Sequence, residues 1–164
     1  MFPDDIEQLA AAVIAAASAR GWTIATAESC TGGLVAGALT AVAGSSAVVD
    51  RGFVTYSNAA KTAMLGVPAG LIVEHGAVSE PVARAMAAGA RDRAGTDLAV
   101  SITGVAGPGG GSADKPVGLV HFACAGPGGL VHEKRLFGDL GREPVRLESV
   151  RVALDLLLAA CEAG

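Results

Sequence analysis

The chain has 164 residues, which is enough for one domain with a substantial core and too few for two ordinary ones. Its net charge of −4 argues against a nucleic-acid-binding surface, because contacts to phosphates require a basic patch. The three cysteines form no CxxC pair, and the acidic N-terminal sequence does not resemble an export signal. The uncharged run 29–49 is too rich in Gly, Ser and Thr for a membrane span. We therefore expect a single cytoplasmic domain over residues 1–164, with neither nucleic acid nor membrane as a partner.

Hydrophobic periodicity and turn residues predict alternating helices and strands. Helices are expected over 4–20, 33–43, 68–74, 79–94 and 143–161, with Ser79 as an N-cap and a further short helix that Asn58 caps and Gly66 stops. Strands are expected over 22–27, 48–57, 98–103, 117–125 and 130–137. The glycine-rich turn at 126–129 makes the last two a hairpin. This order predicts an α/β fold with a mostly parallel sheet, helices on both faces and one antiparallel strand.

The end of the first predicted strand carries the first candidate nucleophile. Glu28 and Ser29 are followed by Cys30, Thr31, Gly32 and Gly33, and a helical pattern then begins. A serine at a strand-turn-helix junction lies beside backbone N–H groups that can hold an oxyanion. A Ser or Thr helix cap before a tight Gly-Gly turn is the alternative interpretation. Cys30 is a rival nucleophile, although free cysteines are more often small buried residues.

Lys61 is the preferred partner for Ser29. It follows the second predicted strand, so it lies on the same edge of the sheet, and partial burial could lower its pKa enough for it to act as a base. Ser-Lys pairs are a variant of the catalytic triad. A surface lysine on a short helix is the alternative. His75, His121 and His132 fall at neither metal-ligand nor triad spacing, so no metal site is predicted.

A glycine-rich loop, 103–112, follows the buried third strand. It matches neither the Walker nor the dinucleotide-binding pattern, although its glycines could let backbone N–H groups approach a phosphate. Arg142 and Arg146 lie four residues apart near the start of the last helix, where they could face a ligand anion or form an ordinary salt bridge. Three loops, 29–33, 56–61 and 103–112, leave the carboxyl ends of strands, where ligands bind in such sheets.

Five segments together resemble the C-terminal domain of the competence/damage-inducible protein CinA, a family that includes stand-alone nicotinamide-mononucleotide amidohydrolases. They are Ala27-Glu-Ser-Cys-Thr-Gly-Gly33, Gly52-Phe-Val-Thr-Tyr-Ser-Asn58 with Lys61, His75-Gly-Ala-Val-Ser-Glu80, Ile102-Thr-Gly-Val-Ala-Gly-Pro-Gly-Gly-Gly111 and Lys115-Pro-Val-Gly118. The resemblance covers nearly the whole chain. It implies a three-layer α/β/α sandwich with a five-stranded mixed sheet and, as the family's habit, a homo-oligomer.

The resemblance also implies a reaction: deamidation of nicotinamide mononucleotide to nicotinate mononucleotide and ammonia in pyridine-nucleotide (NAD) salvage, without metal or cofactor. The family's serine and lysine fall on Ser29 and Lys61. Its substrate pocket is expected near Tyr56, Asn58, Thr103, Gly104, Gly107, Gly109 and Gly110. A non-catalytic nucleotide-binding or partner-binding module on the same fold is the alternative.

Within this hypothesis the residues around Ser29 have separate roles. Thr31 caps the helix, Gly32 and Gly33 let the backbone reach the oxyanion, and Cys30 packs. The family's closing Gly-Asp-Arg-x-x-Val-Arg pattern departs here, because Leu140-Gly141 is inserted before Arg142 and lengthens the loop. The spacing of Arg142 and Arg146 is kept, and both are candidates for binding the substrate phosphate.

Overall fold

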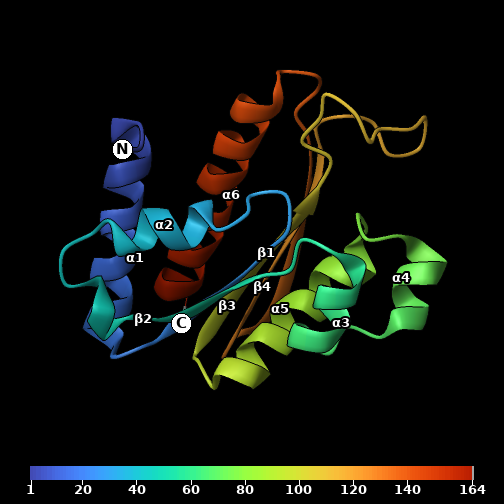
Figure 1. Cartoon of the computed structure of the whole chain (residues 1–164). Helices are drawn as coiled ribbons and strands as arrows, with labels where there is room; N and C mark the ends of the chain where they lie inside the picture. Colours follow the sequence, from blue (N-terminus) through green and yellow to red (C-terminus); the bar gives the residue numbers. More distant parts are fainter. Residues whose placement is uncertain (164) are drawn as a thin grey trace.

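The computed structural model describes residues 1–163, which form alternating helices and strands (Figure 1). In chain order the elements are α1 (Asp4–Arg20), β1 (Ile24–Glu28), α2 (Leu34–Thr40), the 3-10 turn η1 (Ser45–Ala47), β2 (Val49–Val54), α3 (Asn58–Leu65), α4 (Ala69–His75), α5 (Glu80–Ala94), β3 (Leu98–Gly104), β4 (Leu119–Gly126), β5 (Gly129–Leu136) and α6 (Arg142–Ala163). Each expected element is present, with ends shifted by a few residues.

The five strands form one mixed sheet in the order β2-β1-β3-β4-β5. β1 pairs in parallel with β2 and with β3, whereas β4 pairs antiparallel with both β3 and β5. β4 is therefore the one strand that runs against the other four, which confirms the predicted mixed sheet with one antiparallel strand. The carboxyl ends of β1, β2 and β3 consequently meet at one edge of the sheet.

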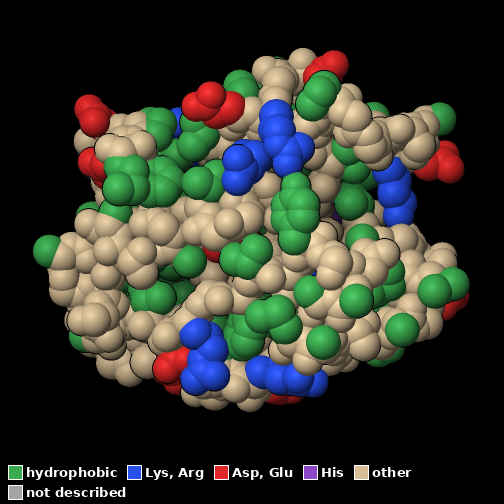
Figure 2. Space-filling model, viewed as in Figure 1, with side chains coloured by type: hydrophobic (Ala, Val, Ile, Leu, Met, Phe, Trp, Pro, Cys, Tyr) green, Lys and Arg blue, Asp and Glu red, His purple; other side chains and the backbone are tan. Residues whose placement is uncertain are grey.

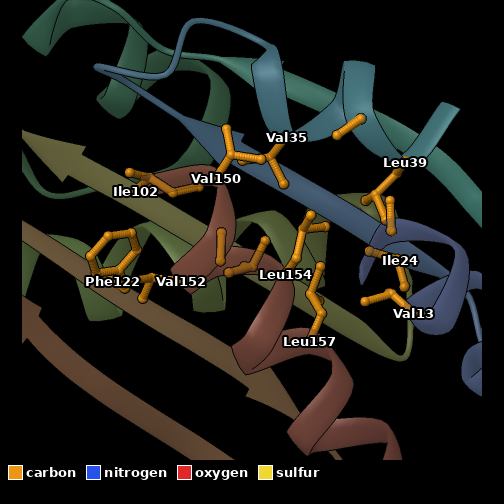
Figure 3. Close-up of a cluster of buried hydrophobic side chains, with 14 of the residues drawn as sticks. Val13, Ile24, Val35, Leu39, Ile102, Phe122, Val150, Val152, Leu154 and Leu157 are labelled. Atoms are coloured by element: carbon orange, nitrogen blue, oxygen red, sulfur yellow. The ribbon is translucent and has the colours of Figure 1, made fainter. Parts of the chain in front are cut away.

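Helices cover both faces of the sheet, so the fold is a three-layer α/β/α sandwich. In Figure 1, α1, α2 and α6 lie on one side, and α3, α4 and α5 lie on the other. The first side holds the larger apolar cluster, in which Phe122 of β4 and Leu154 of α6 are fully buried (Figure 3). Such a cluster supplies most of the stabilisation because it removes apolar surface from water.

The second side of the sheet is built from smaller residues. Ala25 and Ala27 of β1 lie beside Ala99 of β3 on the face that packs against Met86 of α5, and these small side chains let α5 lie close to the sheet. α3 in turn approaches α5 at Gly89, where an added Cβ would stand 1.9 Å from the backbone oxygen of Leu65. The position of α3, which carries Lys61, therefore depends on a glycine in the middle of α5.

The structure corrects the expected caps of α3 and α5. Ser57, rather than Asn58, caps α3, because its hydroxyl oxygen accepts the Ala60 N–H at 3.0 Å while Asn58 is already helical. Ser79 occupies the N-cap position of α5, but its hydroxyl donates to the Gly76 carbonyl and caps no N–H group. Ser57 therefore caps its helix, whereas Ser79 bonds back to the loop that precedes α5.

The cap of α2 also differs from expectation. α2 ends at Thr40 instead of residue 43 and begins after Gly33, and the Thr31 hydroxyl is buried without a hydrogen-bond partner within residues 1–163. The carboxylate of Glu28 takes the capping role instead: it accepts the N–H groups of Val35 at 2.9 Å and Ala36 at 3.0 Å. A fully buried acid therefore joins the end of β1 to the first turn of α2.

Candidate active site

Three loops leave the carboxyl ends of the parallel strands and meet around a cavity of about 270 Å³. Ser29 and Cys30 contribute from the turn after β1, Tyr56 from the segment after β2, and Val78 from the loop before α5. The lining is completed by Arg142 and by the glycine-loop residues Gly104–Gly107, Gly109 and Gly110. The cavity therefore lies at the edge of the sheet where the strand order and direction predict a ligand site.

Ser29 and Lys61 face each other at this edge. The Lys61 Nζ lies 3.1 Å from the Ser29 Oγ and 3.0 Å from the backbone oxygen of Thr55, to which it donates. Lys61 is only 1% exposed, and burial lowers the pKa of its amine from the ordinary value of 10.5. A neutral lysine can accept the hydroxyl proton of Ser29 with its lone pair while one N–H stays on the Thr55 carbonyl.

Cys30 is poorly suited to act as the nucleophile. Its side chain is buried, and burial raises the pKa of the thiol to about 12, so the thiol stays protonated at neutral pH. The positive charge of Arg146 opposes this shift only in part. Of the two adjacent nucleophile candidates, the geometry therefore favours Ser29.

The turn after Ser29 is closed by its own backbone. The Ser29 N–H donates to the Ile102 carbonyl of β3, and the Gly32 N–H donates back to the Ser29 carbonyl at 3.0 Å. Gly32 and Gly33 have φ values of +56° and +105°, which residues with side chains rarely adopt. The N–H groups of Cys30 and Thr31 donate to no backbone or side-chain oxygen in the described chain.

Arg146 contacts this turn from α6. Its Nε donates to the Cys30 carbonyl at 3.0 Å, and its Nη2 donates to the Thr31 carbonyl at 3.2 Å. Arg146 is absent from the residues that line the cavity. The structure therefore gives Arg146 backbone acceptors, which neither the ligand-facing nor the salt-bridge interpretation of its spacing anticipated.

Arg142 does line the cavity and links two of its walls. Its Nη1 donates to the Gly107 carbonyl at 2.8 Å, and its Nη2 donates to the Tyr56 hydroxyl at 2.7 Å. Tyr56 is 62% exposed, so this contact lies at the mouth of the cavity. The longer loop before Arg142 therefore still delivers a guanidinium to the site.

Besides Arg146, two residues expected at the substrate pocket lie outside the lining, and the lining also omits Lys61, Thr31, Gly32 and Gly33. Asn58 is exposed on the first turn of α3, and Thr103 is buried beneath the cavity, where its hydroxyl donates to the Ala77 carbonyl at 2.8 Å. Thr103 thereby fixes the loop that carries Val78. Lys115 donates to the His75 carbonyl at 2.5 Å and holds the same loop from the other side.

Sequence reasoning missed three residues that shape the site. Glu28 shapes the turn through its bonds to the first turn of α2, Thr55 orients the lysine through a backbone carbonyl, and Val78 adds an apolar wall. A backbone contact leaves no side-chain signal, so no pattern could have identified Thr55. Glu28 directly precedes the candidate serine, which was the one available hint.

A second, apolar cavity of about 330 Å³ lies between the β4–β5 turn and the last turns of α6. Cys124, on its wall, has a thiol pKa raised to about 12 by burial. This apolar cavity is larger than the one beside Ser29, but its lining brings together no base and nucleophile. We therefore assign the candidate chemistry to the smaller cavity beside Ser29.

The surface, the side-chain clusters and the helices add three observations. On the face seen in Figure 2, acidic and basic side chains occur in small groups among hydrophobic ones. Within residues 1–163, no three His, Cys, Asp or Glu side chains gather closely enough to hold a metal ion. No helix in the same range has the length and apolar character needed to cross a bilayer.

The fold and site define a three-layer α/β/α protein with a buried lysine beside a serine at the carboxyl edge of its sheet. The family model of the CinA C-terminal domain matches residues 6–161. The chain therefore belongs to the CinA C-terminal domain family. A solved structure, the competence/damage-inducible protein CihA from Agrobacterium tumefaciens, is 55% identical and superposes with a TM-score of 0.96 over 98% of both chains.

Curated relatives fall into two groups by length. A CinA-like protein of Anaeromyxobacter dehalogenans is 53% identical over 98% of this chain, but the match spans only 39% of that relative. The nicotinamide-nucleotide amidohydrolase PncC of Enterobacter agglomerans is 51% identical, and the match covers 93% of both chains. The chain is thus similar over nearly its whole length to a protein named as an amidohydrolase. It is also similar to one part of the longer CinA-like proteins, of which it spans about 39%.

Proposed function

We propose that this chain hydrolyses the carboxamide of nicotinamide mononucleotide, giving nicotinate mononucleotide and ammonia in pyridine-nucleotide salvage. The observation that carries the proposal is the 3.1 Å contact between a buried lysine amine and the Ser29 hydroxyl. The similarity along nearly the full length of the Enterobacter amidohydrolase supports the choice of substrate. The three free, buried cysteines are consistent with a cytoplasmic enzyme.

The first half of the proposed reaction forms an acyl-enzyme. The Ser29 Oγ attacks the amide carbon while its proton moves to the neutral Lys61 Nζ, and the Thr55 carbonyl keeps the amine aimed at Ser29. The developing oxyanion is stabilised by backbone N–H groups of the turn after Ser29. The C–N bond then breaks as Lys61 returns the proton to the leaving nitrogen, so ammonia departs.

The second half releases the acid. A water molecule attacks the ester carbonyl and gives its proton to Lys61, and the C–O bond to Ser29 breaks as that proton returns to the serine oxygen. Lysine is neutral at the start of each half and cationic in between. Burial favours the neutral state and so supports its use as the base.

The remaining polar groups suit a charged nucleotide. Arg142 at the mouth of the cavity and the exposed backbone of Gly109 and Gly110 supply donors for a phosphate. Arg142 is the preferred contact because it lies on the cavity wall, whereas Arg146 lies behind the turn.

The test is ammonia release from nicotinamide mononucleotide by the purified protein and its variants. We expect Ser29→Ala to lower kcat by roughly a thousandfold or more, since loss of a nucleophile has effects of that order. Cys30→Ala, the neighbouring control, should retain most of the activity. Retained activity in Ser29→Ala with loss in Cys30→Ala would overturn the assignment, and binding without ammonia release would favour a nucleotide-binding module.

A further inference from the structure

We propose that Arg146 is a positioning residue that aims the backbone N–H groups of Cys30 and Thr31 at the oxyanion, and that the substrate phosphate binds elsewhere. The inference rests on the proposed function, because it assigns the parts of an oxyanion hole. Its basis is the pair of hydrogen bonds from one guanidinium to the carbonyls of Cys30 and Thr31.

The first bond fixes the Thr31 N–H directly. The Cys30 carbonyl and the Thr31 N–H belong to one planar trans peptide, so the two groups point in opposite directions. When the Arg146 Nε holds that carbonyl from the α6 side, the Thr31 N–H must point away from α6. This N–H has no oxygen acceptor within residues 1–163, as expected of a donor kept for a ligand.

The second bond reaches the Cys30 N–H through one further peptide. Arg146 Nη2 holds the Thr31 carbonyl, and the N–H of the same peptide, that of Gly32, donates to the Ser29 carbonyl. The Ser29 carbonyl and the Cys30 N–H belong to the next peptide and point in opposite directions, so holding that carbonyl also sets the direction of the Cys30 N–H. Two guanidinium bonds therefore fix the direction of both N–H groups that lack an oxygen acceptor among the described residues, and hydrogen bonds linked in this way polarise one another.

The N–H that follows a nucleophile is a recurrent oxyanion donor, and here that group belongs to Cys30. Ser29 and Cys30 both line the cavity, so the Cys30 N–H lies beside the reacting carbonyl, whereas the buried Thr31 is the next residue behind the lining. Gly32 contacts the arginine closely, since an added Cβ would stand 3.4 Å from Arg146 Nη2, an ordinary contact distance. The glycine is favoured there by its φ of +56°, not by the space that the guanidinium needs.

Arginine suits this role better than lysine does. Its planar fork donates two bonds in fixed directions, whereas an ammonium on a flexible stem would hold one carbonyl at a time. These two hydrogen bonds also argue against phosphate binding by Arg146. They use two of its donors, and its side chain does not line the cavity. Arg142, which does line the cavity, is the matched comparison.

The experiment compares Arg146→Gln with Arg142→Gln on two amides, nicotinamide mononucleotide and nicotinamide riboside, which lacks the phosphate. We expect Arg146→Gln to lower kcat by about 100-fold to 1,000-fold on both, the size of losing an oxyanion donor, with KM little changed. Arg142→Gln should raise KM for the mononucleotide and not for the riboside. A loss in Arg146→Gln that appears in KM and only with the phosphorylated substrate would overturn the inference.

Two further measurements separate positioning from general destabilisation. Arg146→Lys keeps the charge and should recover only part of kcat, and millimolar guanidinium should raise kcat of Arg146→Ala. Full activity in Arg146→Lys, or no rescue in a folded Arg146→Ala, would contradict a two-bond positioning role.

The rate of Ser29 phosphonylation by a fluorophosphonate gives a readout without nicotinamide. In that step the serine oxygen bonds to phosphorus, fluoride leaves and the serine proton goes to Lys61. We expect the Arg146 variants to be labelled at least tenfold more slowly than wild type. If wild type is labelled but releases no ammonia, the proposed substrate is wrong, while labelling rates of the variants still decide the role of Arg146.

Discussion

At the scale of single residues, Lys61 faces opposing demands from stability and from the proposed chemistry. Lys61 is only 1% exposed, and this burial destabilises the charged form of its amine. The fold nevertheless holds the amine 3.1 Å from the Ser29 hydroxyl. Such a conflict is typical of functional sites, and the rest of the fold must offset the stability that is lost there. Both sides of it can be measured.

We expect the proposed activity to rise with pH on a limb set by Lys61. Burial lowers the pKa of its amine below 10.5, so the neutral, basic form is populated at a lower pH than it is for an exposed lysine. The pH dependence of kcat/KM for ammonia release measures this. Lys61→Arg should abolish the limb together with the activity, because arginine does not deprotonate; an unchanged profile in that variant would rule out Lys61 as the base.

The same residue affects stability with a defined sign. Since the folded pKa lies below the unfolded one, the unfolded chain binds more protons in the interval between them, and the free energy of unfolding rises with pH there. Lys61→Met should therefore be more stable than wild type at neutral pH, with a gap that narrows toward pH 10. Urea unfolding at several pH values checks this, with exposed Lys134→Met as the control.

At the scale of elements, the contact between α3 and α5 sets the place of the lysine. Gly89 allows α5 to approach the end of α3, where Leu65 is the last helical residue. Because Lys61 lies one turn earlier on α3, a change in this contact reaches the candidate site. A glycine that looks unfavourable in mid-helix therefore has a packing reason.

Gly89→Ala should reduce the free energy of unfolding by about 1–3 kcal/mol, as overpacking does, and should lower activity by shifting α3. Gly70→Ala is the control: Gly70 lies in α4 with open space around it, so the substitution should stabilise by up to about 1 kcal/mol. Chemical denaturation measures both. Equal effects at the two positions would show that helix propensity, and not the α3–α5 contact, decides the outcome.

Much of the element order could be predicted from the sequence, because the spacing of apolar residues and the turn residues that indicate each element lie within that element. Helical periodicity identified α1, α2 and α6, cap and end residues identified α5, and the glycine turn identified the β4–β5 hairpin. Caps were less predictable, because Glu28 reaches N–H groups seven and eight residues ahead, outside the usual capping spacing. Arg146 could not be placed, since its acceptors lie more than one hundred residues away in the chain.

At the scale of the whole molecule, two histidines join the α5 layer to the sheet. His121 Nδ1 lies 2.9 Å from His132 Nε2 across β4 and β5, and His132 Nδ1 lies 3.3 Å from Glu80 at the start of α5. The spacing of eleven residues did not predict this pair, because it depends on the register of the hairpin. Lys134, Lys115 and Arg84 are the nearby cations.

Acid should destabilise the protein through this pair. Burial, followed by the neighbouring His132 and lysines, lowers the pKa of His121 to about 4. The unfolded chain then binds more protons between about pH 4 and 6.5, so the free energy of unfolding falls as pH drops through that range, by at most about 3 kcal/mol and by less where solvent screens the ring. His121→Gln should flatten this slope in pH-dependent denaturation, whereas exposed His75→Gln should not; equal slopes in all three proteins would contradict the assignment.

The reversed direction of β4 has a practical consequence for handling the protein. Because β4 runs against its neighbours, the exposed turn at 127–129 lies at the edge of the sheet opposite Ser29 and Lys61. Gly128 has open space around it, and loop tips of this kind tolerate insertions. A fluorophore or surface tether attached there would leave the mouth of the cavity facing free solution.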